Sequence, residues 1–179
     1  MSAVPPSPAP TALSRAAFVD RFGGVYEHSP WVAENAFDAG LGADAATPAG
    51  LSAALHAQVM AGGRDRQLAL LRAHPDLAGK LALAGGLTAD STAEQAGAGL
   101  DQCTPEELEA FRSLNDRYKA TFGFPYILAV RGRHRTEILA DFRARVENAP
   151  EAEFAEALEQ VRRIALLRIE ALADAGAAG

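Results

Sequence analysis

Cysteine is almost absent from this chain, because Cys103 is the only one among its 179 residues. A single cysteine excludes an intrachain disulfide and a cysteine-based metal site, and it favours a reducing compartment. No run of about 18 apolar residues occurs, which excludes a membrane-spanning helix. The first residues lack a basic region followed by an apolar stretch, and the last three are not a peroxisomal signal. We therefore expect a globular protein of the cytoplasm.

Positive charge is also scarce, since 17 lysines and arginines stand against 23 aspartates and glutamates. The resulting net charge of −6 opposes non-specific binding to nucleic acid or to an anionic membrane surface. Neither is expected as a partner. The basic stretch RGRHR at residues 131–135 is accordingly interpreted as a solvated loop and not as a phosphate contact.

Strand signals are nearly missing as well. Only residues 126–130, YILAV after Pro125, resemble a short extended run, and no second strand is available to pair with it. A parallel sheet would need strands that alternate with helices. We expect an all-α fold, a single-domain compact bundle of seven to nine helices. Residues 1–12 are expected to be a disordered, proline-rich leader, and residues 13–175 the helical domain.

Capping residues and prolines predict where the helices begin. Ser14, Ser29 and Thr47 each precede a helical pattern, and Thr104 begins the clearest signal, a cap followed by proline and a capping-box glutamate at Glu107. The expected helices cover residues 15–22, 30–39, 48–61, 64–73, 105 to about 120, 136–147 and 151–173.

His74 is the first candidate for chemistry. Pro75 pushes the residue before it out of the α region, so the preceding helix must end near His74. Imidazole is the side chain best suited to moving a proton near neutral pH. Two interpretations are open at this point: His74 is an acid–base group, or the His–Pro pair only stops a helix.

A short polar cluster, STAEQ at residues 91–95, follows a run rich in glycine and alanine. Hydrogen-bonding side chains gathered among small residues are typical of a ligand pocket. The alternative is a helix start, with Ser91 as the cap and Glu94 completing a capping box. The two interpretations are compatible, because the N-terminus of a helix attracts an anionic ligand.

Arg168 lies on an otherwise apolar stripe of the last predicted helix. The other members of that stripe are Phe154, Leu158, Val161, Ala165 and Leu172. An arginine in such a place needs a partner, because an unpaired buried charge is very costly. It either binds a ligand oxygen with its guanidinium fork, or it snorkels or pairs with an internal carboxylate.

Five segments together resemble one known family. They read FGGVYEHSPW, LLRAHPDLAGK, STAEQ, LNDRYKATFGFPYILAVRG and VRRIALLRI, and they span about residues 14–173. In this order and spacing they are similar to the 2-oxo-4-hydroxy-4-carboxy-5-ureidoimidazoline (OHCU) decarboxylases, which act in the degradation of urate to allantoin.

The resemblance implies an all-helical homodimer that decarboxylates OHCU to (S)-allantoin with neither a metal nor an organic cofactor. The catalytic positions that it implies are His74 and Glu94. The positions that match the family's substrate-binding residues are Pro75, Ser91, Thr92, Ala93, Glu94, Gln95, Tyr126, Ile127, Leu128, Ala129, Val130 and Arg168.

Two other classes of function are compatible with the sequence. His74, Asp76 and Glu94 suggest a metal-dependent hydrolase, although no known metal-binding spacing supports it. A helical interaction module without activity is the other. Such a module needs an exposed apolar face, whereas the candidate residues of this chain are polar.

Overall fold

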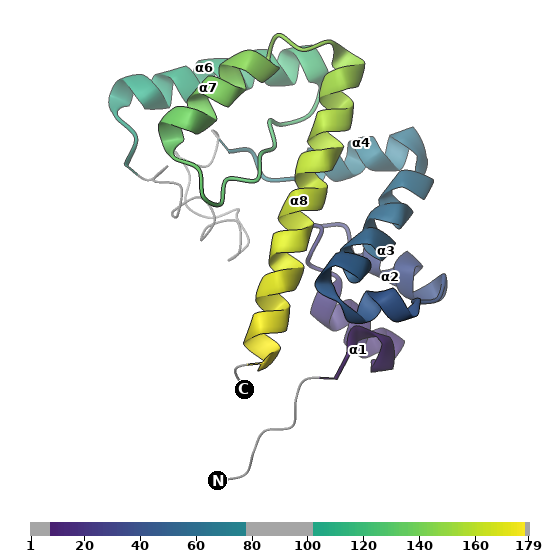
Figure 1. Cartoon of the computed structure of the whole chain (residues 1–179). Helices are drawn as coiled ribbons and strands as arrows, with labels where there is room; N and C mark the ends of the chain where they lie inside the picture. The colour runs from purple at the N-terminus through teal and green to yellow at the C-terminus, as the bar shows by residue number, and fades with distance from the viewer. Residues whose placement is uncertain (1–7, 78–101, 178–179) are drawn as a thin grey trace. The chain divides into compact units, whose positions relative to one another are not determined.

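The computed structural model describes residues 8–77 and 102–177 (Figure 1). Within these ranges the chain forms seven α-helices, two short 3₁₀ helices and no strand. The expected all-α fold is therefore confirmed. In the same ranges, no helix combines the length and the apolar character that crossing a membrane requires.

The described residues divide into two compact units. The first contains residues 8–70 and 162–177, and the second contains residues 71–77 and 102–161. The boundaries fall inside α4 (Gly63–Ala73) and inside α8 (Pro150–Ala177).

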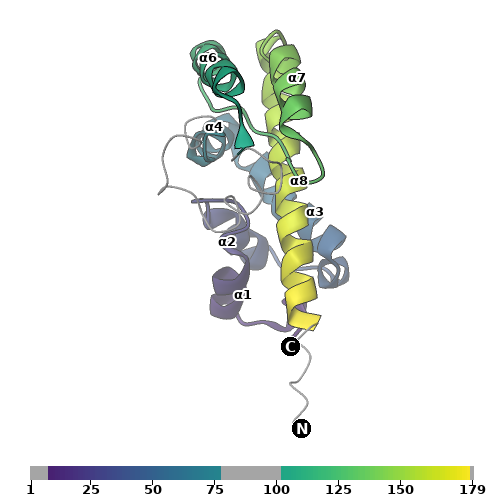
Figure 2. The ribbon, with the colours of Figure 1, turned by 90° about the vertical axis from the view of Figure 1, so that its left-hand side faces the viewer.

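The first unit consists of the N-terminal helices and the C-terminal part of α8 (Figure 2). Its other elements are η1 (Pro10–Ala12), α1 (Arg15–Phe22), α2 (Trp31–Asp38), η2 (Ala43–Ala46), α3 (Pro48–Ala61) and the first part of α4. Aromatic rings join α1 to α2, because the ring centroids of Phe18 and Phe37 are 5.5 Å apart. Helix η1 lies within the expected leader, and residues 1–7 are outside the described ranges.

The second unit contains α6 (Pro105–Phe122), α7 (Arg135–Arg145) and the first part of α8. Helices α6 and α7 lie side by side in both views (Figures 1 and 2). Aromatic residues fill the space between them. Tyr118 from α6 packs edge-on against Phe142 from α7, with 5.8 Å between ring centroids, and Phe111 also contacts Phe142.

Three of the predicted helix starts are confirmed in atomic detail. Ser14 accepts a hydrogen bond from the Ala17 N–H, and Thr47 accepts one from the Gly50 N–H. The capping box of Thr104 and Glu107 is complete, with distances of 2.9 and 3.1 Å. These signals succeed because a cap satisfies N–H groups within one turn of itself.

The predicted cap at Ser29 is wrong. Helix α2 begins at Trp31, and Pro30 occupies the cap position without a side-chain hydrogen bond. The reason is a turn just before the helix: His28 has a positive φ of 55°, and the Ser29 N–H donates to the Tyr26 carbonyl. The turn leaves Pro30, and not Ser29, at the cap position.

The interpretation of residues 131–135 as a solvated loop is wrong at its last position, Arg135, which is helical, whereas His134 is exposed and precedes the helix. His134 caps α7, because its Nδ1 accepts from the Thr136 N–H while Glu137 accepts from the His134 N–H. Arg135 is the first residue of α7, and its Nε lies 2.8 Å from Glu107 Oε2. Together with the capping hydrogen bond from the Thr104 N–H, this arginine lowers the pKa of the Glu107 carboxyl.

Candidate functional site

His74 lies immediately after α4, where the sequence predicted the helix to end. Its N–H donates to the Leu71 carbonyl at 3.2 Å, which closes the last turn, and Pro75 beside it is buried. The end of α4 is tied to α6, since Arg72 Nε donates to the Gly123 carbonyl at 2.9 Å. Gly123 has a positive φ of 76°, which a residue with a side chain adopts only at a cost.

The chain after His74 is held to α6 by Asp76. The Asp76 carboxylate accepts a hydrogen bond from Asn115 Nδ2 at 2.9 Å and lies 3.4 Å from Lys119 Nζ. Asn115 and Lys119 are four residues apart and therefore occupy one face of α6. Sequence reasoning missed both of these residues, although their spacing on an amphipathic helix was a signal. Their role is to fix the turn that carries His74.

The cluster at residues 91–95 lies outside the described residues, and with it the predicted roles of Ser91, Thr92, Ala93, Glu94 and Gln95. Those roles stay predictions. The alternative metal site of His74, Asp76 and Glu94 also lies partly outside the described residues, because Glu94 does. Among residues 8–77 and 102–177, no three histidine, cysteine, aspartate or glutamate side chains come close enough together to bind a metal ion.

Residues 126–130 form an irregular segment that joins no sheet within the described part of the chain. Tyr126, Ile127, Leu128 and Val130 are all buried. Tyr126 is stacked on Phe142, with 3.8 Å between ring centroids and 14° between the ring planes. The second unit thus contains both the His74–Pro75 turn and this segment, and the hydrogen bond from Arg72 reaches the turn that precedes the segment.

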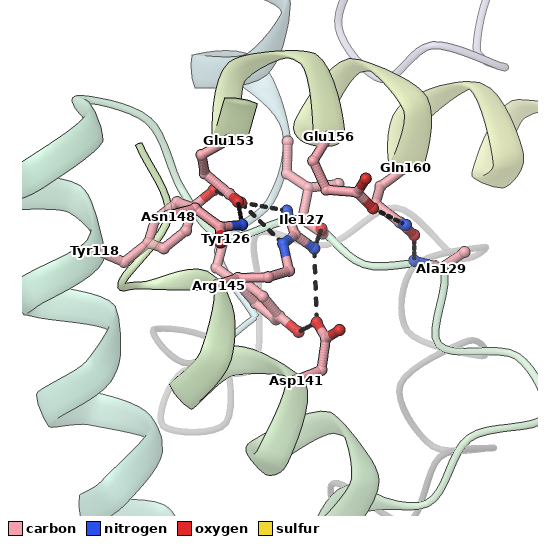
Figure 3. Close-up of polar contacts among 10 residues, drawn as sticks. All are labelled: Tyr118, Tyr126, Ile127, Ala129, Asp141, Arg145, Asn148, Glu153, Glu156 and Gln160. Atoms are coloured by element: carbon pink, nitrogen blue, oxygen red, sulfur yellow. Dashed lines mark hydrogen bonds and ion pairs between the residues drawn. The ribbon is translucent and has the colours of Figure 1, made fainter. Parts of the chain in front are cut away.

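A buried ion pair lies next to the segment (Figure 3). Arg145 on α7 donates to Glu153 Oε1 on α8 from both Nε and Nη2, at 2.9 and 2.5 Å. The Glu153 side chain is fully buried and the Arg145 side chain is 6% exposed. Tyr118 and Asn148 also donate to the Glu153 carboxylate, at 2.5 and 2.9 Å.

Two side chains, one on α7 and one on α8, form hydrogen bonds to the backbone of residues 126–130. Arg145 Nη1 donates to the Ile127 carbonyl at 2.7 Å, and the Ala129 N–H donates to Gln160 Oε1 at 3.0 Å. Sequence reasoning missed Arg145, Glu153 and Gln160. A signal existed, because residues 153, 157, 160 and 164 form a second buried stripe on α8, with polar residues at two of its positions.

Burial and the ion pair change the pKa values in this cluster. Burial raises the pKa of the Tyr118 hydroxyl, and the hydrogen bond to Glu153 raises it further. Burial and the hydrogen bond to Asp141 raise the pKa of Tyr126 in the same way. Burial alone would lower the pKa of the Arg145 guanidinium, but the hydrogen bonds and charge of Glu153 outweigh it and raise that pKa. Both tyrosines therefore stay neutral while Arg145 stays charged.

The raised tyrosine pKa values predict a loss of stability in alkali. The phenols of the unfolded chain ionise above about pH 10, whereas Tyr118 and Tyr126 stay protonated when folded. The contribution of the two tyrosines to the free energy of unfolding is complete below pH 10. Above pH 10 that free energy falls, by up to about 1.4 kcal/mol per pH unit for each tyrosine. Urea unfolding at pH 9, 10 and 11 should show a shallower decline for Tyr118→Phe than for the unchanged protein. Equal declines would contradict the assignment.

Arg168 belongs to the first unit and is 4% exposed. Its Nη2 lies 3.0 Å from Glu27 Oε1, and its Nη1 donates to the Val25 carbonyl at 3.2 Å. The internal carboxylate that one interpretation required is therefore present. The stripe around Arg168 is buried as expected from Phe154 to Ala165, whereas Leu172 is half-exposed. A role of Arg168 in binding substrate stays a prediction.

Known proteins match nearly the whole chain. Residues 11–170 match the family model of the OHCU decarboxylases. The 2-oxo-4-hydroxy-4-carboxy-5-ureidoimidazoline decarboxylase of Haloferax volcanii is 41% identical over 152 residues, which are 85% of this chain and 86% of the relative. The enzyme of the same name from Mus musculus is 35% identical over 162 residues, which cover 88% and 87% of the two chains.

Solved structures agree with these sequence matches. A crystal structure of (S)-allantoin synthase has a TM-score of 0.73 at 36% identity, and the match covers 92% of this chain. This chain spans about half the length of that protein, since 53% of it is covered. An OHCU decarboxylase crystallised in the presence of (S)-allantoin has a TM-score of 0.61 at 21% identity, a likeness that concerns the fold alone. Because the family model covers most of the chain and the sequence relatives match along most of their own length, the chain belongs to the OHCU decarboxylase family.

Proposed function

We propose that this chain decarboxylates OHCU to (S)-allantoin and uses neither a metal nor an organic cofactor. The observation that carries this proposal is the family match over residues 11–170, together with a relative that is 41% identical along most of both chains. The described geometry supports it, because a histidine follows the end of α4 on a turn that Asp76 anchors to α6.

The chemistry of the substrate explains why no cofactor is needed. The bond between the ring carbon and the carboxylate breaks and CO₂ leaves. The freed electron pair forms a C=C bond to the ureido-bearing carbon, while the π pair of the adjoining C=N bond moves to the ring nitrogen. The ureido-bearing carbon and the ring nitrogen each gain a proton, while the hydroxyl loses one as it becomes a carbonyl. The net reaction consumes one proton. The protein has to orient the carboxylate, stabilise the developing charge and deliver the proton to one face.

His74 acts as the acid–base group beside the hydroxyl and the carboxylate of the substrate. Imidazole suits this role because its usual pKa lies near neutrality. By resemblance to the family, Glu94 and Gln95 hold ureido or ring N–H groups. Ser91 and the backbone of residues 126–130 complete the contacts to the substrate.

The test is circular dichroism of a urate reaction driven by urate oxidase and hydroxyisourate hydrolase, with and without this protein. The unstable substrate is then formed in place. We expect one-handed allantoin to build up faster than in the control, and to do so equally well with a chelator present. Racemic allantoin at the uncatalysed rate would contradict the proposal. Activity that the chelator abolishes would favour a metal-dependent enzyme instead.

Arg168 is proposed to bind a substrate oxygen, and the variant Arg168→Lys tests this role. Lysine keeps a positive charge beside the buried carboxylate of Glu27 but loses the planar fork of donors. We expect KM to rise about tenfold, the effect of losing roughly 1.4 kcal/mol of binding, with a smaller change in kcat. An unchanged KM together with a lowered melting temperature would mean that Arg168 is structural only.

We also propose that the protein is a homodimer located in the cytoplasm, as the resemblance and the single cysteine suggest. Size-exclusion chromatography with light scattering should give the mass of two chains. A mass of one chain at micromolar concentration would contradict the dimer.

A further inference from the structure

The irregular segment at residues 126–130 is attached to its surroundings at two backbone groups. Arg145 Nη1 on α7 donates to the Ile127 carbonyl at 2.7 Å, and Gln160 Oε1 on α8 accepts from the Ala129 N–H at 3.0 Å. These two groups belong to residues two positions apart. Leu128 lies between them in the sequence.

Both side chains that hold the segment are themselves fixed. Arg145 is locked by two hydrogen bonds to Glu153, and its Nη1 lies 3.7 Å from Asp141. Gln160 is 3% exposed, and its Nε2 donates to Glu156 Oε1 at 2.6 Å. Figure 3 shows Arg145 bonded to Glu153 and Gln160 bonded to Ala129 and Glu156. Side chains held by a second layer of hydrogen bonds position their partners to within a fraction of an ångström.

The geometry points to Arg145 and Gln160 as positioning residues for the decarboxylation. With the Ile127 carbonyl and the Ala129 N–H each bound to a fixed side chain, the N–H and C=O of Leu128 between them are held in place as well. A donor and an acceptor side by side match an amide or ureido edge, which offers the complementary pair. Arg145 and Gln160 thus act on the reaction through the backbone of the segment. This inference rests on the proposed function.

The cost of burying polar groups indicates that Arg145 and Gln160 position the segment and do not merely fill the core. An ion pair such as Arg145–Glu153 in a protein interior adds little to stability compared with apolar residues of similar volume, because desolvation of both charges is costly. Gln160 likewise occupies a stripe where Ala157 and Ile164 are apolar. Each of the two residues makes one hydrogen bond to the backbone of residues 127–129.

The test compares kcat/KM and the melting temperature of four proteins in the coupled urate assay at 25 °C. Gln160→Met removes the acceptor for the Ala129 N–H at similar volume. The double variant Glu156→Gln/Gln160→Glu exchanges the amide and the carboxylate. A carboxylate oxygen at position 160 can then accept from the Ala129 N–H, and the amide at position 156 can donate to that carboxylate. Thr104→Ala removes the cap of α6 and serves as a stability control, because it costs about 1 kcal/mol away from the segment.

We expect Gln160→Met to lower kcat/KM by at least about tenfold, because a small displacement of a positioned group is costly to the rate. The exchanged variant should return to within about threefold of the unchanged protein, and Thr104→Ala should stay within that range. The inference is overturned if Gln160→Met keeps its kcat/KM while its melting temperature falls. It is also overturned if the exchange restores the melting temperature but not kcat/KM. Failure of the proposed function is distinguishable, because the unchanged protein would then match the uncatalysed rate.

Discussion

His74→Asn is expected to lower kcat by about 10²- to 10⁴-fold, the range in which a positioned acid–base group contributes. Asparagine keeps a polar side chain of similar reach but cannot exchange a proton near neutral pH. The turn itself should survive, because Pro75, the Arg72–Gly123 hydrogen bond and the Asp76–Asn115 hydrogen bond do not involve the imidazole. The coupled assay gives kcat, and far-UV circular dichroism confirms that the variant is folded.

The matched control for this variant is His28→Asn. His28 is exposed and has a φ of 55°, a conformation that asparagine tolerates well, so this substitution should leave both the fold and the activity unchanged. A near-normal kcat for His74→Asn would remove His74 from the mechanism. Equal losses in the two variants would mean that histidine replacement acts through stability.

Arg145→Met is expected to destabilise the second unit strongly. The substitution leaves the fully buried Glu153 carboxylate without its cation, and breaking a buried pair in this way costs about 3–5 kcal/mol. In a protein of this size the melting temperature should fall by roughly 10 °C. Urea denaturation, followed by far-UV circular dichroism, measures the free energy of unfolding.

Two comparison variants separate the cost of an unpaired buried charge from other causes of destabilisation. Arg145→Met/Glu153→Gln removes both charges and keeps an oxygen for Tyr118 and Asn148, so it should recover much of the loss. Arg117→Ala breaks the Arg117–Glu147 pair, which has the same 2.5 Å separation but is more than half exposed. That change should cost only about 0–1 kcal/mol. Equal costs for the exposed and the buried arginine would contradict the burial argument.

The clearest helix boundaries were predictable because their signals lie within one turn of their effect. Thr104 caps α6 because Glu107 is three residues away, and α4 ends at Ala73 because Pro75 restricts the residue before it. The prediction failed at Ser29, where the turn at residues 26–29 leaves Pro30 at the cap position. It also missed the cap at His134, since histidine is not a usual capping residue.

In the candidate site, too, the features set by local signals were predictable and the tertiary contacts were not. The sequence by itself determined that a histidine follows the end of α4, that residues 126–130 lie outside the helices without a strand partner, and that Arg168 lies on a buried stripe. Each follows from proline geometry or from helical and extended periodicity, which act over a few residues.

Only the tertiary structure decided the partners. Glu27 is 141 residues away from Arg168, Tyr118 is 35 residues from Glu153, and Gln160 is 31 residues from Ala129. No local rule selects one buried carboxylate or amide among many along the chain. That choice is made when packed helices bring the groups within hydrogen-bonding distance, because an interior without water leaves each polar group only the partners beside it.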